Sequence, residues 1–262
     1  MQGLLRISAL SLVVSLSGGA RALVGPAPVP APRSEAGRPI VIGSSYALFS
    51  KALVDVRRIN VYLPDDYGQE DTPFPVIFLL DGGEKEDFHH ITGLAQITAA
   101  YGEGRELIVV GIEGKDRRHD LTPPSSNATD RRLIPTSGGA GAYRRFLLDE
   151  LKPWVASHFR IDGRTALMGE SLAGLFVAET LLKAPSSFDD YIIVSPSLWW
   201  DDGALSKQAA QDLKRGNFSH RRAWIAFDDP APPASQADKE RADQDRLEKP
   251  SPKSIRRAWR GR

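Results

Sequence analysis

Residues 164–182 read RTALMGESLAGLFVAETLL, and this stretch decides the fold. Residues 165–168 form a short apolar run of strand length, and an apolar run of helical length follows Ser171. Gly169 and Ala173 stand two positions before and after the serine. A strand that turns sharply into a helix needs small side chains there, because the two elements approach closely. The pattern predicts a tight turn that presents the Ser171 hydroxyl; the alternative is an ordinary strand–helix turn with a surface serine.

The rest of the chain alternates between apolar runs of strand length and helical patterns. Apolar runs predict strands over residues 40–53, 54–63, 73–80, 106–112, 191–195 and 222–227. Helices are expected over residues 88–101, 142–159 and 203–214. The first two strands are expected to pair antiparallel. The alternation predicts an α/β fold with a doubly wound, mostly parallel sheet and helices on both faces.

Reactive side chains follow several of the expected strands. They are Asp81-Gly82-Gly83, Arg117 in the next loop, Ser171, Trp199-Trp200 and Asp228-Asp229. Because the carboxyl ends of parallel strands meet at one edge, we expect these groups to converge on an active site. Residues 113–141 are expected to form a long polar loop, which is either functional or a flexible insertion.

Composition excludes several classes of function. At 262 residues the chain suits one α/β domain, and its net charge of +1 gives no basic footprint for nucleic acid. The absence of cysteine excludes disulfides, zinc–thiolate sites and a cysteine nucleophile. Gly102-x-Gly104 precedes a strand instead of following one, which argues against a dinucleotide site. We therefore expect no cofactor. We also expect no metal, because His89 and His90 lack a third ligand at useful spacing. The two histidines are expected to line a pocket instead.

The ends of the chain differ from its centre. Residues 1–22 carry Arg6, an apolar run too short to span a bilayer and a small-x-small site, which predicts a signal peptide; a disordered N-terminus is the alternative. Residues 23–38 predict a Pro/Ala-rich linker, 39–229 the folded domain and 230–262 a disordered tail. We therefore expect a periplasmic or secreted protein without a membrane partner after signal cleavage.

Five motifs carry a resemblance to a known family. They are NVYLPDDY (60–67), VIFLLDGG (76–83), DRRHDLTP (116–123), GESLAGLF (169–176) and SPSLWWDD (195–202). In this order and spacing, the chain from about residue 40 to 227 resembles the esterase branch of the α/β-hydrolases. That branch includes the enterobactin (siderophore) esterases and the feruloyl-esterase-like proteins. The resemblance implies attack of a serine on an ester carbonyl and hydrolysis of the resulting acyl-enzyme.

The resemblance also assigns roles to residues. Ser171 is expected to be the nucleophile. The N–H groups of Leu172 and Gly83 are expected to hold the oxyanion. Asp229, after the last expected strand, stands where the triad acid belongs. Arg117, with its neighbour Arg118, is expected either to bind an acidic substrate group or to remain a solvated loop charge.

Two further side chains are expected to bind a small-molecule ester substrate. Trp199 is expected to form an aromatic wall, with core packing as the alternative for it or for Trp200. His89 is expected to face the pocket, at the start of the helix over residues 88–101. The family usually has arginine where His119 stands, which leaves the ligand of that loop open.

The resemblance breaks at the triad histidine. The only histidine after the serine is His220, which precedes the strand over residues 222–227 and so belongs at its amino end. The last strand, histidine loop and helix of the family are missing, which suggests a shifted frame or truncation near Pro230. Two functions therefore remain open: a serine hydrolase of siderophore-like or aromatic carboxylic esters, and an impaired pseudo-hydrolase that binds ligand without turnover. His89 or His90 could replace the missing base in the first.

Overall fold

The computed structural model describes residues 37–69 and 71–227. The expected signal peptide, most of the linker, Asp229 and the tail over residues 230–262 lie outside the described residues. Those expectations therefore remain predictions.

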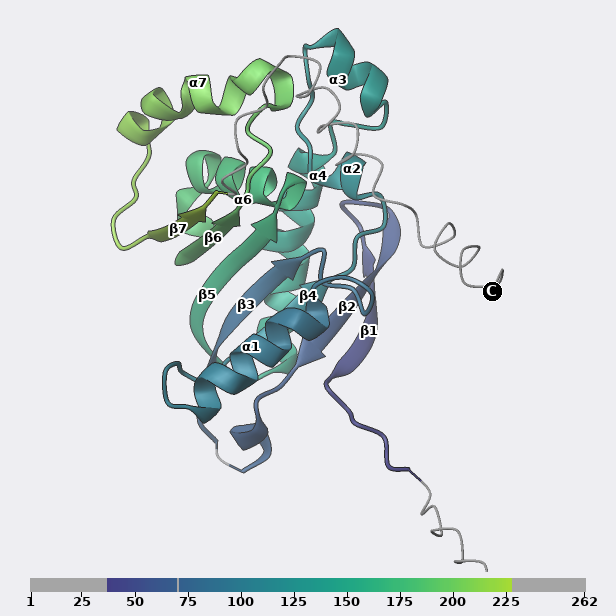
Figure 1. The fold of residues 1–262 in the computed structure, drawn as a ribbon, viewed down its shortest axis with the longest axis vertical. Coiled ribbons are helices and arrows are strands. Elements are labelled where there is room, and N and C mark those ends of the chain that lie inside the picture. The colour runs from purple at the N-terminus through teal and green to yellow at the C-terminus, as the bar shows by residue number, and fades with distance from the viewer. Residues whose placement is uncertain (1–36, 70, 228–262) are drawn as a thin grey trace, which may run out of the picture. The chain divides into compact units, whose positions relative to one another are not determined.

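Within the described residues, seven strands form a single sheet in the order β1-β2-β4-β3-β5-β6-β7. Their bounds are β1 Ser44–Ser50, β2 Asp55–Tyr62, β3 Phe74–Leu80, β4 Ile108–Ile112, β5 Ile161–Glu170, β6 Asp190–Val194 and β7 Arg222–Ala226. β1 pairs antiparallel with β2, and β2 pairs antiparallel with β4. All other pairings are parallel (Figure 1). The α/β fold with a mostly parallel sheet is thus confirmed, as is the antiparallel entry pair.

Helices cover the two faces of the sheet unequally. On one face, α1 (Phe88–Ala100) packs on β2, β3 and β4. Figure 1 shows this helix in front of the sheet, and among the described residues no helix covers β5, β6 and β7 on that side. The other face carries α4 (Ala140–Arg145), the π-helical segment η2 (Phe146–Leu151), α5 (Lys152–His158) and α6 (Leu172–Lys183).

The side chains of β3 show why its sequence is apolar throughout. Phe78 and Leu80 belong to the larger core beneath α6, whereas Leu79 belongs to the smaller core beneath α1. All three are at most 2% exposed. Because successive residues of a strand face opposite sides, a strand covered on both faces needs an unbroken apolar run. This burial fixes β3 at the centre of the sheet, and its carboxyl end leads directly to Asp81.

The expectation of a plain loop over residues 113–141 was wrong in part. It contains two short helices, α2 (Arg117–Asp120) and α3 (Ala128–Leu133). Side-chain caps explain both starts: Asp116 accepts the N–H of His119, and Asn127 accepts the N–H groups of Thr129 and Asp130. The segment is therefore a structured insertion.

The insertion is tied to the first turn of α7 (Trp200–Arg215). Asp201, Asp202 and Gly203 have positive φ values of 52°, 54° and 73°, so the regular helix starts after them. The Asp201 carboxylate accepts the N–H of Ser126 at 2.7 Å and its hydroxyl at 2.8 Å. Asp130 in turn accepts the N–H of Asp201 at 2.7 Å. These bonds hold the insertion and α7 together.

Membrane-spanning helices and metal-binding clusters are both absent from the described residues. Across residues 37–69 and 71–227, no helix combines the length and the hydropathy that a bilayer-spanning segment requires. In the same part of the chain, no three His, Asp or Glu side chains gather closely enough to hold a metal ion.

Candidate active site

The turn between β5 and α6 has the strained geometry that its sequence predicts. Ser171 lies at φ 58° and ψ −114°, outside the region that a serine ordinarily adopts. Its N–H donates to the Val194 carbonyl of β6 at 3.0 Å, which fixes the turn against the neighbouring strand. A Cβ atom at Gly169 would lie 2.7 Å from Ala173, and one at Gly174 would lie 2.7 Å from the Val194 carbonyl oxygen. The small residues around the serine are therefore required by close backbone contacts.

The Ser171 hydroxyl has a neighbour that the sequence analysis did not identify. Its Oγ lies 3.3 Å from the Oγ of Ser197, and the Ser197 N–H donates to the Ser171 carbonyl at 3.0 Å. Ser197 is 6% exposed. Ser197 belongs to the SPSLWWDD motif, so the sequence places it near the carboxyl edge of the sheet. Its contact with Ser171 is visible only in the fold.

Leu172 supplies a backbone donor beside the serine. It is the first residue of α6, and the first N–H groups of a helix have no acceptor within the helix. Such a position is suited to stabilising negative charge, since the positive end of the helix dipole points there. The Leu172 N–H therefore lies where the expected role of an oxyanion donor requires it.

The second expected oxyanion donor, Gly83, is engaged by a carboxylate. Its N–H donates to Glu86 Oε2 at 2.7 Å, and the same oxygen accepts the N–H of Gly114 at 3.1 Å. Burial raises the pKa of Glu86, with the two N–H groups opposing this in part. Asn60, buried on β2, donates to the Gly82 carbonyl at 3.0 Å. Because a carbonyl and the next N–H point in opposite directions, this bond orients the Gly83 N–H.

Arg117 is bound to the same loop. Its Nε lies 3.1 and 3.0 Å from the two Asp81 carboxylate oxygens, and its Nη2 lies 2.7 Å from one of them. Asp81 has a φ of 52°, a left-handed turn directly after β3. Burial lowers the pKa of Arg117, but the hydrogen bonds and charge of Asp81 outweigh it and the net pKa is raised; Glu86 and Glu170 contribute in the same direction. Arg117 therefore links α2 to the loop of Gly83.

The two other expected substrate-binding residues lie in different surroundings. His89 is exposed at the start of α1, with its ring centre 6.1 Å from that of Phe88. Trp199 is half-buried and packs on the larger core, edge to face with Trp200 at 5.9 Å. Trp200 is 2% exposed and donates to the Pro123 carbonyl at 3.0 Å, so it is the core member of the pair.

All five histidines of the chain lie within the described residues, and there none hydrogen-bonds to Ser171. His119 contacts the Thr136 carbonyl, and His158 contacts the Trp154 carbonyl. His220 lines a shallow depression with Arg164 and Asp189, at the amino ends of the strands, as expected.

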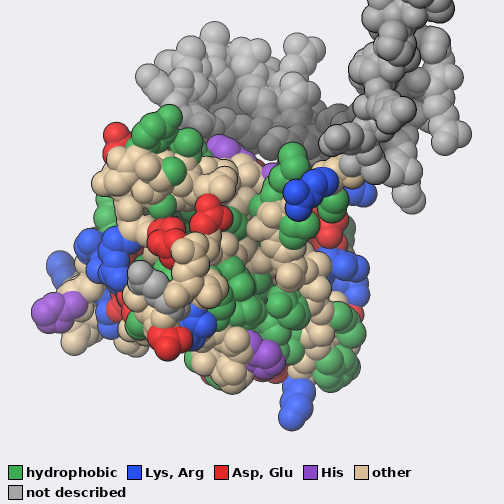
Figure 2. All heavy atoms as spheres, turned by 90° about the horizontal axis from the view of Figure 1, so that it is seen from below, with side chains coloured by type: hydrophobic (Ala, Val, Ile, Leu, Met, Phe, Trp, Pro, Cys, Tyr) green, Lys and Arg blue, Asp and Glu red, His purple; other side chains and the backbone are tan. Residues whose placement is uncertain are grey.

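Figure 2 shows the molecule from below, where hydrophobic side chains gather in one area with charged side chains around them.

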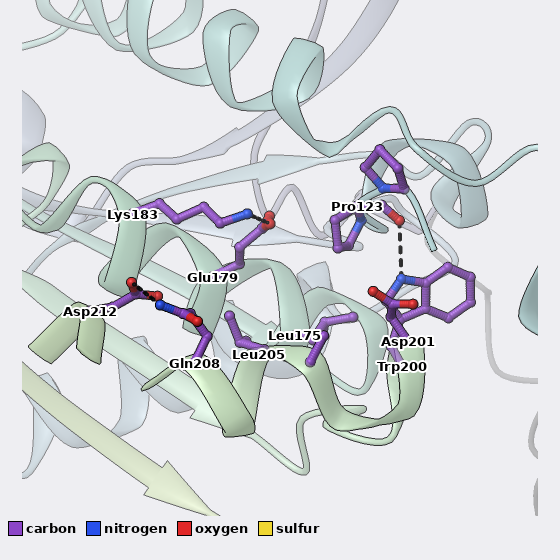
Figure 3. Close-up of a pocket in the computed structure, with 11 residues that line it drawn as sticks. Pro123, Leu175, Glu179, Lys183, Trp200, Asp201, Leu205, Gln208 and Asp212 are labelled. Carbon is purple, nitrogen blue, oxygen red and sulfur yellow. Dashed lines mark hydrogen bonds and ion pairs between the residues drawn. The ribbon is translucent and has the colours of Figure 1, made fainter. Parts of the chain in front are cut away.

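A cleft of about 310 Å³ lies between α6, α7 and the prolines at 123 and 124. Figure 3 shows Leu175 and Leu205 along it, with the Glu179–Lys183 ion pair at one end and Trp200 at the other. Ser171 does not line this cleft. Leu175, one helical turn after Ser171 on α6, is the lining residue nearest to the serine in the sequence.

Comparisons with known proteins agree with this geometry. A family model described as "Putative esterase" matches residues 50–247. Ferri-bacillibactin esterase BesA of Bacillus subtilis is 33% identical over 151 residues, covering 52% of this chain and 52% of the relative. The siderophore triacetylfusarinine C esterase of Aspergillus fumigatus is 30% identical over 215 residues, covering 74% of this chain and 66% of the relative. The chain thus spans only about half to two-thirds of the length of these curated relatives.

A solved structure extends the likeness to the fold. An IroE-like serine hydrolase from Shewanella oneidensis has a TM-score of 0.65 at 28% sequence identity, over 78% of this chain and 68% of that chain. The region matched by the family model, residues 50–247, includes the serine turn, the loop after β3 and the motif after β6. The chain therefore belongs to the "Putative esterase" family of α/β-hydrolases, whose curated members include siderophore esterases.

Proposed function

We propose that this protein is a serine hydrolase that cleaves carboxylic esters through an acyl-enzyme on Ser171. The observation that carries the proposal is the backbone of Ser171, held at φ 58° between β5 and α6 beside the first N–H of that helix. The Ser171 oxygen attacks the ester carbonyl, and the alcohol leaves. The N–H of Leu172 stabilises the oxyanion, and water then releases the acid.

Gly83 is the second oxyanion donor in this proposal. Its N–H must exchange the Glu86 carboxylate for the oxyanion during the reaction, because one N–H makes one strong hydrogen bond. Asn60 orients the peptide that carries this N–H, and Arg117 fixes the turn at Asp81 that precedes it. Removing one oxyanion donor typically costs about 2.7–4 kcal/mol of transition-state stabilisation.

The hydrolase proposal also needs a general base for Ser171. We assign the acid to Asp229. Because no histidine hydrogen-bonds to Ser171, we propose His89 as the replacement base, since it lies in the first turn of α1, close to the loop after β3. A hydrolase that lacks a triad member retains only about 10³–10⁴-fold acceleration over water. The second candidate is therefore a pseudo-hydrolase that binds an ester without turnover. It is favoured by the contact of Ser171 with Ser197 in place of a base.

The substrate class follows from the relatives and from the groups near the serine. The relatives named above are esterases of siderophores, so we propose a siderophore-like or aromatic ester. Arg117 and Trp199 would contact its acidic and aromatic parts, and His89 would face the same ligand. A signal peptide over residues 1–22 would place the protein in the periplasm or outside the cell, with a small molecule as its partner.

Hydrolysis of p-nitrophenyl acetate by purified protein tests the proposal, with Ser171→Ala as the matched variant. We expect Ser171→Ala to lose all activity above background. A fluorophosphonate probe should add one adduct to the wild type, located at Ser171 by mass spectrometry. Equal hydrolysis by both proteins would refute the enzyme. Absence of turnover together with Ser171-independent binding of a catechol ester, followed by tryptophan fluorescence, would establish the pseudo-hydrolase.

A further inference from the structure

β7 is an exposed apolar strand at the edge of the sheet. Within the described residues it pairs with β6 alone. All five of its residues are exposed, including Trp224 at 50% and Ile225 at 54%, and Phe227 directly after it is 64% exposed. An edge strand with free backbone groups and apolar side chains is a ready template for pairing with another strand.

The backbone groups on the free edge can be assigned from the bonds to β6. The Arg222 N–H donates to the Asp189 carbonyl, and the Ala226 carbonyl accepts the N–H of Ser195. Arg222 and Ala226 therefore direct their backbone groups toward β6. Because these directions alternate along a strand, Ala223 and Ile225 direct their N–H and carbonyl groups toward the free edge, as does Phe227 if the strand continues.

We propose that β7 pairs antiparallel with β7 of a second copy of this chain, about a two-fold axis at Ile225. Ile225 then faces its own equivalent as a hydrogen-bonded pair, which uses the free N–H and carbonyl of both copies. The contact is isologous and closes after two chains. Two seven-stranded sheets become one continuous sheet.

Side-chain sizes select this register. With the axis at Ile225, Trp224 faces Ala226 of the second copy, and Phe227 faces Ala223, so each aromatic side chain meets an alanine. Directly opposed side chains on one face approach to about 4.5–5.5 Å between Cβ atoms, so this matching avoids a clash. An axis at Trp224 would instead oppose two indole rings, each already beneath the guanidinium of its own Arg222 at 4.9 Å.

The size match favours a second copy of this chain as the occupant, because one strand supplies both members of each aromatic–alanine pair. The residues after Asp229 read PAPP, with proline at positions 230, 232 and 233. Proline has no N–H to donate to a ladder, which makes this sequence unfavourable for pairing with β7.

The chain contains no cysteine, which permits a direct test with the full-length protein. A single Ile225→Cys variant should form a disulfide between copies on mild oxidation, because the paired Cα atoms would lie about 5.5 Å apart, within disulfide range. The matched control is Ala47→Cys on β1, the exposed strand at the opposite edge, which should stay uncrosslinked. Equal crosslinking of both variants, or none at position 225, would overturn the register.

Sedimentation equilibrium gives the second measurement. The wild type should be a closed dimer, and Ile225→Lys should raise the dimer dissociation constant roughly tenfold or more, since it places two like charges at the axis. Ala47→Lys should leave the constant unchanged, and circular dichroism should show both variants folded. Three results would each contradict the proposal: a wild-type monomer at about 100 μM, open-ended oligomers, or a dimer that Ile225→Lys leaves unaffected.

Discussion

Gly169→Ala is the substitution that most directly tests the geometry of the serine turn. The added Cβ would lie 2.7 Å from the backbone carbon and from the Cβ of Ala173, whereas ordinary contact begins at 3.4 Å. The start of α6 would therefore have to move by about 0.7 Å, because the clash is with backbone and not with a flexible side chain. Overpacking of this kind costs about 1–3 kcal/mol. At about 2–4 °C per kcal/mol for a domain of this size, Tm should fall by about 2–12 °C.

The same displacement should also reduce any esterase rate. Leu172 and Ser171 begin the helix that must move, and a misplacement near 1 Å can cost about 10²-fold in rate. Thermal unfolding and p-nitrophenyl acetate hydrolysis measure the two effects. The control is Gly93→Ala on α1, where an added Cβ meets no atom within 4 Å. Alanine should raise stability there by about 0.5–1 kcal/mol. A Gly169→Ala variant with wild-type Tm and rate would refute the close-approach argument.

Three further substitutions address the loop after β3. Asn60→Ala should lower the hydrolysis rate with little change in KM, because the Gly83 N–H loses its orientation; an unchanged rate would rule this out. Glu86→Gln should raise kcat, since a neutral amide competes less with the oxyanion. Burial raises the pKa of Glu86 and disfavours its charged form, so Glu86→Gln should also stabilise the protein at neutral pH. This gain should vanish below pH 4.5, the ordinary pKa of glutamate, because the carboxyl is then protonated in both the folded and the unfolded protein. Urea titrations at neutral pH and below pH 4.5 test the sign. Arg117→Lys keeps the charge but loses the two-point contact with Asp81. It should lower Tm by a few degrees, about 1 kcal/mol, and a rise in Tm would contradict this account.

The strands and the serine turn could be predicted from the sequence because their signals are local. An unbroken apolar run identified β3, and the small residues Gly169 and Ala173 identified the turn at Ser171. α2 and α3 escaped because each is shorter than two turns and depends on a single capping side chain, Asp116 or Asn127. So short a helix has no apolar period to recognise.

The candidate site could be predicted as a set of positions but not as a set of contacts. The sequence placed Gly83 and Arg117 after neighbouring strands. It could not show that Glu86 bonds to the first, or that Asp81 pairs with the second through a left-handed turn. Such pairings depend on the rotamers and backbone angles of residues distant in the chain. Asp229 lies outside the described residues and remains a prediction.

The bonds between Asp201 and the segment around Ser126 restrict how the sequence of this fold can diverge. Four hydrogen bonds from Ser125, Ser126 and Asn127 converge on one carboxylate oxygen. The stretch before α3 and the first turn of α7 therefore form one module, although 74 to 76 residues separate the bonded positions in the sequence. A chimera that imports either stretch from a relative should therefore fold stably only when the other is transplanted with it.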